Sequence, residues 1–230
     1  MSKKKTIFFD AAGTLFYVSH GVGYHYSRIA EKYGVRVDAT YIDQRFHDAY
    51  ANSSPMALSG KQEEKNWWRD LVSLVFNEVP FPKFELFFDE VYDFFQQGHG
   101  EEERAWTLFP ETIEVLAHLQ ATQHPIGLIS NFDSRIESIL KNLKIFHFFQ
   151  TITYSSETGF AKPSVQIFQQ ALKKANCLPK QAIHIGDHLI FDVQGAENAG
   201  MQAFFIDRTG KHQGKNVIRD LREIYGRLQG

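Results

Sequence analysis

Two carboxylates and an ammonium group stand where folding could bring them to one place. Asp10 ends the apolar run KTIFFD, Asp187 follows the run QAIHIG, and Lys162 lies in AKPS, just before a predicted helix. Two neighbouring carboxylates repel unless a cation lies between them, and their oxygens suit Mg²⁺, which keeps several waters and shares a substrate phosphate. The lysine would offset the negative charge of both acids and of that phosphate.

A hydroxyl and an amide complete this set of polar groups. Ser130 and Asn131 come at the end of the run PIGLIS. In an open parallel sheet, ligands bind beyond the carboxyl ends of the strands, because several loops converge there. If these runs are neighbouring strands, all five side chains meet at one edge, and Ser130 is placed to hold phosphate oxygens.

The elements that must position these residues alternate between strand and helix. Short apolar runs begin at residues 4, 125, 148, 181 and 202. Between them lie helical patterns, namely PETIEVLAHLQ, SRIESILKNL, SVQIFQQALKKAN and FDVQGAENAG. This alternation predicts an α/β fold, a Rossmann-like parallel sheet covered by helices on both faces.

A second region has a different pattern. Residues 17–103 are rich in aromatic side chains that recur at helical spacing, in YHYSRIAEKYG, YIDQRFHDAYA, KNWWRDLVSLVF and FELFFDEVYDFF. We predict a four-helix cap over residues 17–103, inserted into a core formed by residues 1–16 and 104–230. Aromatic stripes of this kind are typical of a packed core.

The composition excludes several classes of partner. The 230 residues carry a net charge of −2, with Lys and Arg spread evenly, so no nucleic-acid partner is indicated. No apolar run approaches the roughly 18 residues of a membrane span. The single cysteine, Cys177, rules out an internal disulfide. Together these features favour a cytoplasmic protein with a small-molecule substrate.

Four motifs in order, FFDAAGTLF, LISN, AKPSVQIF and IGDHLIFDVQGAENAG, resemble those of the haloacid dehalogenase-like hydrolase superfamily. The similarity is to subfamily I, whose helical C1 cap follows the first motif, and it is greatest to the branch called haloacid dehalogenase-like hydrolase domain-containing proteins. The resemblance covers nearly the whole chain. It implies a small phosphorylated substrate.

The resemblance also implies a role for each residue that binds substrate. Asp10 would be the nucleophile that forms an aspartyl-phosphate, and Thr14 would help to shape the loop that follows it. Ser130 would bind the transferred phosphoryl group, with Asn131 nearby. Lys162 would fix nucleophile and phosphate together.

A Mg²⁺ site follows from the same resemblance. Asp187 would bind the ion directly, together with a carboxylate oxygen of Asp10 and the backbone carbonyl of Ala12. Asp192 would orient or bind the same ion.

The chain departs from the phosphatase pattern at Ala12, where those enzymes carry an Asp that protonates the leaving group and then activates water. Losing a positioned acid or base lowers a rate by roughly 10² to 10⁴. A phosphatase here could draw its acid from His20, His25 or His188. It could instead act on acyl or aryl phosphates, which leave without protonation.

Three further hypotheses accommodate Ala12. A phosphonate-cleaving enzyme would need a Schiff-base lysine in the cap, for which Lys61 and Lys65 are available. A 2-haloacid dehalogenase needs no proton for its halide, but its mechanism uses no metal, whereas GDHLIFD keeps both acids of the magnesium motif. A binding or regulatory module would retain the phosphate site without turnover.

Overall fold

The computed structural model describes residues 4–53, 60–98 and 104–228. Its main sheet has six strands, all parallel, in the order β5-β4-β1-β6-β7-β8. These strands are β1 (Thr6–Phe9), β4 (Ile126–Ser130), β5 (Thr151–Tyr154), β6 (Ala182–Gly186), β7 (Gln202–Ile206) and β8 (Val217–Ile218). The predicted Rossmann-like α/β fold is confirmed, and each of the five predicted strands is present.

The central strands are apolar because helices cover both faces of the sheet. Every residue of β1, β4 and β6 is buried, as expected for interior parallel strands. On one face Phe8 and Ile129 pack on α8 (Val165–Lys174) and α9 (Gly195–Asn198). On the other, Ile7 belongs to the cluster that includes α5 (Thr112–Ala121), α6 (Ile136–Asn142) and α10 (Ile224–Arg227).

Short helical turns complete the sheet region. The helix α7 (Ser155–Thr158) follows β5, and a π-helical turn, η3 (Leu189–Gln194), leads from β6 into α9. The other turns are η1 (Phe146–Phe148), η2 (Pro179–Gln181) and η4 (Leu221–Glu223).

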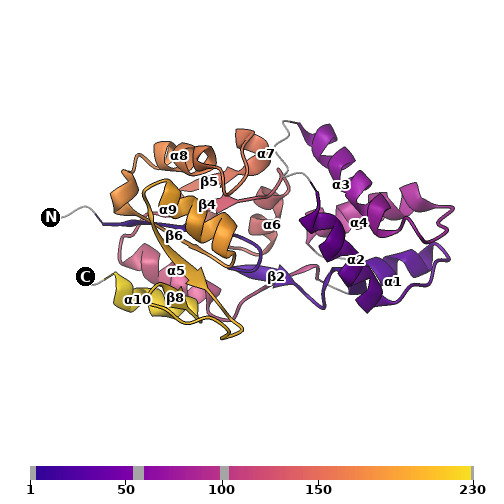
Figure 1. Cartoon of the computed structure of the whole chain (residues 1–230), viewed down its shortest axis with the longest axis horizontal. Helices are drawn as coiled ribbons and strands as arrows, with labels where there is room; N and C mark the ends of the chain where they lie inside the picture. Colours follow the sequence, from indigo (N-terminus) through magenta and orange to yellow (C-terminus); the bar gives the residue numbers. More distant parts are fainter. Residues whose placement is uncertain (1–3, 54–59, 99–103, 229–230) are drawn as a thin grey trace.

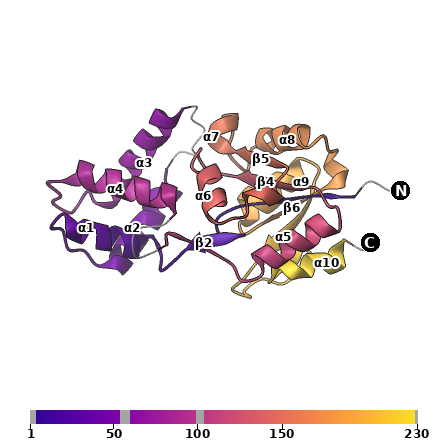
Figure 2. The ribbon, with the colours of Figure 1, turned by 180° about the vertical axis from the view of Figure 1, so that it is seen from behind.

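Four helices stand apart from the sheet, at the opposite end of the molecule from the chain termini (Figures 1 and 2). We call them the cap helices: α1 (Val22–Lys32), α2 (Ala39–Ala51), α3 (Lys61–Val75) and α4 (Phe84–Gln97). Their aromatic side chains pack on one another, as between Phe76 and Phe87, whose ring centroids lie 5.0 Å apart. The four predicted helices are thus present, and most of their aromatic stripe is core.

A two-stranded ribbon that the sequence analysis missed joins the two regions. The strand β2 (Phe16–Val18) pairs antiparallel with β3 (Trp106–Leu108). Both predicted domain boundaries, near residues 17 and 103, fall at or beside this ribbon; the division into core and cap remains our proposal. In the described part of the chain, no helix has the length and apolar character needed to cross a bilayer.

Candidate active site

The side chain of Asp10 lies at the carboxyl end of β1, buried among groups from three other loops. Its Oδ1 accepts hydrogen bonds from Ser130 Oγ at 3.0 Å and Lys162 Nζ at 2.6 Å. Asp10 is 6% exposed and Lys162 is 3% exposed. A buried carboxylate with two such donors is held in one orientation, as a nucleophile requires.

Lys162 is fixed at both its backbone and its ammonium group. The amide of Asn131 donates to the Lys162 carbonyl at 2.9 Å and accepts from the Lys162 N–H at 2.6 Å. The ammonium group donates to Asp10, to the Ile129 carbonyl at 3.1 Å, and to Asp192 Oδ1 at 2.5 Å. Asn131, predicted to bind substrate, therefore serves in this structure to place Lys162.

Asp192 reaches this centre from the turn η3, and protein donors engage both its oxygens. Oδ1 accepts from Lys162 and lies 2.9 Å from Nε2 of the buried His184, while Oδ2 accepts from the His188 N–H at 3.0 Å. A Cβ at Gly186 would clash with the Asp192 carboxyl group, so only glycine permits this approach. Burial alone would raise the pKa of Asp192, but Lys162 and His184 outweigh it and hold the pKa well below its usual range.

Asp187 faces the turn that follows β1. Its Oδ1 lies 3.4 Å from Thr14 Oγ1. Gly13 has a φ of +89°, and a Cβ there would clash with Asp187 Oδ2. The turn therefore needs glycine for its conformation and for the space that the carboxylate occupies.

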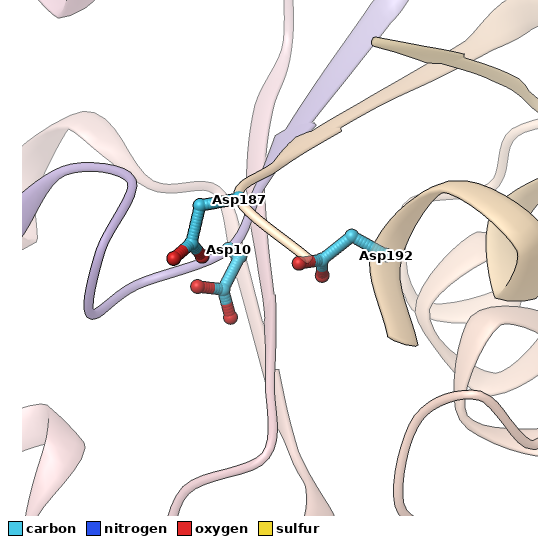
Figure 3. Close-up of side chains that lie close together, drawn as sticks. All are labelled: Asp10, Asp187 and Asp192. Carbon is cyan, nitrogen blue, oxygen red and sulfur yellow. The ribbon is translucent and has the colours of Figure 1, made fainter. Parts of the chain in front are cut away.

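The three carboxylates converge on one point, as Figure 3 shows. One oxygen each of Asp10, Asp187 and Asp192 lie within 4.8 Å of one another. Burial, together with the charges of Asp10 and Asp192, raises the pKa of Asp187 to about 7. Burial also raises the pKa of Asp10, and Lys162 offsets this only in part. Three acids against one lysine leave excess negative charge, so the arrangement fits a divalent cation.

A cavity of about 590 Å³ opens from this centre toward the cap helices. Ala12, Gly13 and Asp187 line it on the catalytic side. The aromatic residues that line it are Tyr17, Tyr26, Phe46, Tyr50, Trp68, Phe88, Tyr92, Phe95, Trp106 and Phe132. Some aromatic side chains of the cap, which the sequence pattern assigned to packing, thus form a ligand-sized pocket.

The predicted substitutes for the missing acid lie in different places. His188 lines the cavity, but its Nδ1 accepts from the Ile190 and Phe191 N–H groups and its ring stacks on Phe191. His25 is buried, with Nε2 2.7 Å from the Ser19 carbonyl. Neither His25 nor the exposed His20 is among the described residues that line the cavity.

The cap lysines also lie away from the cavity as the structure describes it. Lys65 pairs with Asp89 at 2.6 Å, and its ammonium group lies 5.3 Å from the centre of the Tyr92 ring. Lys61 is exposed at the start of α3. Neither is among the described cavity-lining residues.

The sequence analysis missed a set of contacts that joins the cap helices to the loop after β4. Buried Glu64, on α3, accepts from the Ser134 N–H at 3.2 Å and from the hydroxyls of Ser134 and Ser156. Trp68 donates to Asp133, which also pairs with Arg135 at 2.7 Å. The buried charges pointed to special positions, but no local pattern paired them across 65 to 92 residues.

Comparison with known proteins identifies the family. The sequence model of the haloacid dehalogenase-like hydrolases matches residues 4–200. This chain belongs to the haloacid dehalogenase-like hydrolase family. An uncharacterized hydrolase of Schizosaccharomyces pombe is 31% identical over 218 residues, covering 90% of this chain and 92% of its own. Haloacid dehalogenase-like hydrolase domain-containing protein 3 of Homo sapiens is 28% identical over 218 residues, covering 92% and 84%. The predicted superfamily and branch are confirmed.

Solved structures of the same fold include proteins of different activity. A HAD-hydrolase, YfnB of Bacillus subtilis, bound to magnesium, aligns with a TM-score of 0.76 at 20% identity over 99% of this chain and 100% of its own. A phosphatase of Thermococcus onnurineus gives 0.68 at 22% over 98% of each chain, and an L-2-haloacid dehalogenase of Xanthobacter autotrophicus gives 0.75 at 15% over 99% of each. At these identities the likeness shows the fold alone.

Proposed function

We propose that this hydrolase is a Mg²⁺-dependent phosphatase that transfers a phosphoryl group from a small substrate to Asp10. The observation that carries the proposal is the meeting of Asp10, Asp187 and Asp192 within 4.8 Å around one buried lysine. A buried, fixed nucleophile beside an acidic cluster is the arrangement that phosphoryl transfer through a carboxylate requires. The magnesium-bound relative of similar fold supports the choice of metal.

Each residue then has a defined part in the reaction. A carboxylate oxygen of Asp10 forms a bond to phosphorus while the bond from phosphorus to the leaving oxygen breaks, and the bonding electrons depart with that oxygen. Ser130 and Lys162 would hold phosphoryl oxygens and offset their charge. Water then attacks phosphorus, releasing phosphate and regenerating Asp10. Ala12 can neither protonate the leaving group nor activate the water, so a substrate with a stable leaving anion is favoured.

The residues that would hold the cation are Asp10, Asp187 and the carbonyl of Ala12. Bound there, Mg²⁺ would neutralise phosphoryl charge and bring Asp10 and the phosphate together. Because protein donors engage both oxygens of Asp192, we assign Asp192 chiefly to orienting Lys162 and the turn that carries Asp187.

A phosphate-release assay tests the proposal. Wild-type protein should hydrolyse an activated aryl phosphate with Mg²⁺ and stop when EDTA is added, and Asp10→Asn should be inactive. Asp93→Asn, an exposed change on α4, serves as the matched control. Turnover that survives EDTA, or equal turnover by Asp10→Asn and wild type, would refute the proposed mechanism.

A 2-haloacid dehalogenase is the second candidate, favoured by Ala12 and by the aromatic wall of the cavity. A halide needs no proton to leave. Halide release from a 2-haloacid in the presence of EDTA, without phosphatase activity, would select this activity instead.

A phosphonate-cleaving enzyme and a non-catalytic module have less support. A Schiff-base mechanism would require a lysine in the cavity, whereas Lys61 and Lys65 lie outside its described lining. A non-catalytic phosphate-binding module would bind phosphate and Mg²⁺ without turnover above that of Asp10→Asn. The cytoplasmic location and the small phosphorylated substrate remain predictions from the sequence.

A further inference from the structure

The cavity beside Ala12 adds information that the catalytic groups alone do not give, namely the shape and polarity of the leaving group. Resting on the proposed phosphatase activity, we infer that the substrate is an aryl phosphate monoester whose ring system fills this cavity. Acyl phosphates and alkyl phosphates, which the sequence leaves open, are then poor fits, for reasons of polarity and of leaving-group chemistry respectively.

The position of the cavity assigns it to the leaving group. Ala12 and Gly13 line it, and they follow the nucleophile directly in the turn after β1. Asp187, the predicted metal ligand, lines the same side. A phosphate held between Asp10 and Lys162 would therefore place the organic part of the ester on the cavity side of the site.

Aromatic side chains from both regions form the wall. Tyr50 and Trp68, on α2 and α3, stack with ring centroids 6.4 Å apart and an interplanar angle of 25°. Other chain segments contribute Trp106 and Phe132, whose centroids lie 6.0 Å apart. Aromatic faces and edges contact a flat ring favourably, and about 590 Å³ lies within the range of pockets for small organic ligands.

The polar groups that line the cavity are largely occupied by protein partners. Arg135 donates to Asp133 through Nε and Nη2, and its guanidinium carbon lies 4.7 Å from the Trp68 ring centroid and 4.4 Å from that of Tyr92. Asp43 accepts from the Gly23 N–H at 2.7 Å, and Asn131 binds the Lys162 backbone. A sugar would lose its water contacts here and gain few hydrogen bonds in return.

The methyl group of Ala12 leads to the same substrate class by independent chemistry. A phenol has a pKa of about 10, against about 16 for water, and alkanols resemble water. When Asp10 attacks phosphorus, the bonding electrons leave with the aryl oxygen as a stable phenolate, which takes a proton from solvent afterwards. An alkoxide would need the proton donor that Ala12 does not provide.

Four phosphates separate ring binding from leaving-group chemistry: 2-naphthyl phosphate, 2-naphthylmethyl phosphate, acetyl phosphate and glycerol 3-phosphate. We expect the highest kcat/KM for 2-naphthyl phosphate. Its naphthylmethyl analogue should have a similar KM and a kcat about 10²-fold lower, because only the leaving group differs. Acetyl phosphate should be hydrolysed with a KM roughly tenfold higher or more, since it has no ring to bury, and glycerol 3-phosphate should be the poorest substrate.

A substitution within the cavity supplies the matched test. Val22→Phe, which fills space in the cavity lining, should lower the kcat/KM ratio of 2-naphthyl phosphate to acetyl phosphate by roughly tenfold or more. Val217→Phe, at a comparably part-buried valine on β8 outside that lining, should leave the ratio unchanged.

The outcomes separate the two proposals. Mg²⁺-dependent hydrolysis of acetyl phosphate, with a KM equal to or below that of 2-naphthyl phosphate, would overturn the aryl assignment and leave the phosphatase standing. An unchanged ratio in Val22→Phe would also overturn it. No turnover of any of the four would refute both. In that case, calorimetry with Asp10→Asn would still show whether 2-naphthyl phosphate binds more tightly than glycerol 3-phosphate.

Discussion

The carboxyl edge of the sheet and the cavity next to it use their polar groups in different ways. At the edge, Lys162 alone donates to Asp10, Asp192 and a backbone carbonyl, so the charges are concentrated on one point. In the cavity, the buried pair of Arg135 and Asp133 is enclosed by aromatic rings and directed at itself. The difference indicates that the edge carries the chemistry whatever the leaving group, whereas the cavity selects which leaving group enters.

Removing the cation at the sheet edge should have the largest effect. Lys162→Met would leave Asp10 and Asp192 buried without their shared partner. We expect a loss of about 3–5 kcal/mol in the free energy of unfolding and a fall in phosphatase activity on the order of 10³-fold. Urea denaturation and phosphate release measure the two effects.

The exposed ion pair of Lys174 and Glu157 offers the control. Lys174→Met should change stability by less than about 1 kcal/mol. Equal losses in the two variants would mean that the buried cluster has no special role.

Restoring an acid beside the nucleophile should blur the contrast between the edge and the cavity. Ala12→Asp adds a carboxyl group at the boundary of the two regions, where it could protonate an alkoxide. Turnover of 2-naphthylmethyl phosphate should rise about 10²-fold, while that of 2-naphthyl phosphate changes little. If both rates change together, the leaving group is not what limits the wild-type enzyme.

The turn after β1 offers a smaller test, in which a close contact is separated from backbone strain. Gly13 and Gly159 both have positive φ, +89° and +72°, but of these two only Gly13 would bring an added Cβ against another atom, an oxygen of Asp187. Gly159→Ala should lower stability by about 1–2 kcal/mol with activity intact. Gly13→Ala should also weaken Mg²⁺ binding, measured by calorimetry. Unaltered Mg²⁺ affinity in Gly13→Ala would contradict the placement of Asp187.

The pH dependence of metal binding should be the mildest effect. The pKa of Asp187 in the metal-free protein is raised to about 7, so below that pH a proton competes with the cation. The Kd for Mg²⁺ should fall several-fold, to about tenfold at most, between about pH 6 and pH 7 and level off above about pH 8. In Asp187→Asn the affinity should be weak at every pH. A wild-type affinity that is constant across this range would disagree with this account.

Local sequence pattern predicted the scaffold well, because buried parallel strands and amphipathic helices have distinct periodicities. Asp10, Ser130, Lys162 and Asp187 could be placed at one edge because strand ends converge there. Whether they perform the predicted chemistry is for the experiments to decide. The β2–β3 ribbon escaped prediction because three-residue strands carry no periodic signal.

Further contacts could not be predicted because they depend on register and packing between distant segments. Asn131 holds the Lys162 backbone, and His184 supports Asp192 from within β6. The cap contacts of Glu64 are of the same kind. His184 stood out as a lone polar residue in an apolar strand, but its partner was not evident from that.

Trapping the phosphorylated enzyme tests the central claim most directly. Wild-type protein is mixed with acetyl phosphate and Mg²⁺, quenched in acid and reduced with borohydride, which converts an aspartyl-phosphate to homoserine. Peptide mass spectrometry should then find homoserine at position 10, and only when Mg²⁺ is present. Homoserine at another aspartate, or a yield at position 10 that is unaffected by EDTA, would contradict the assignment of Asp10 as the nucleophile of a metal-dependent phosphatase.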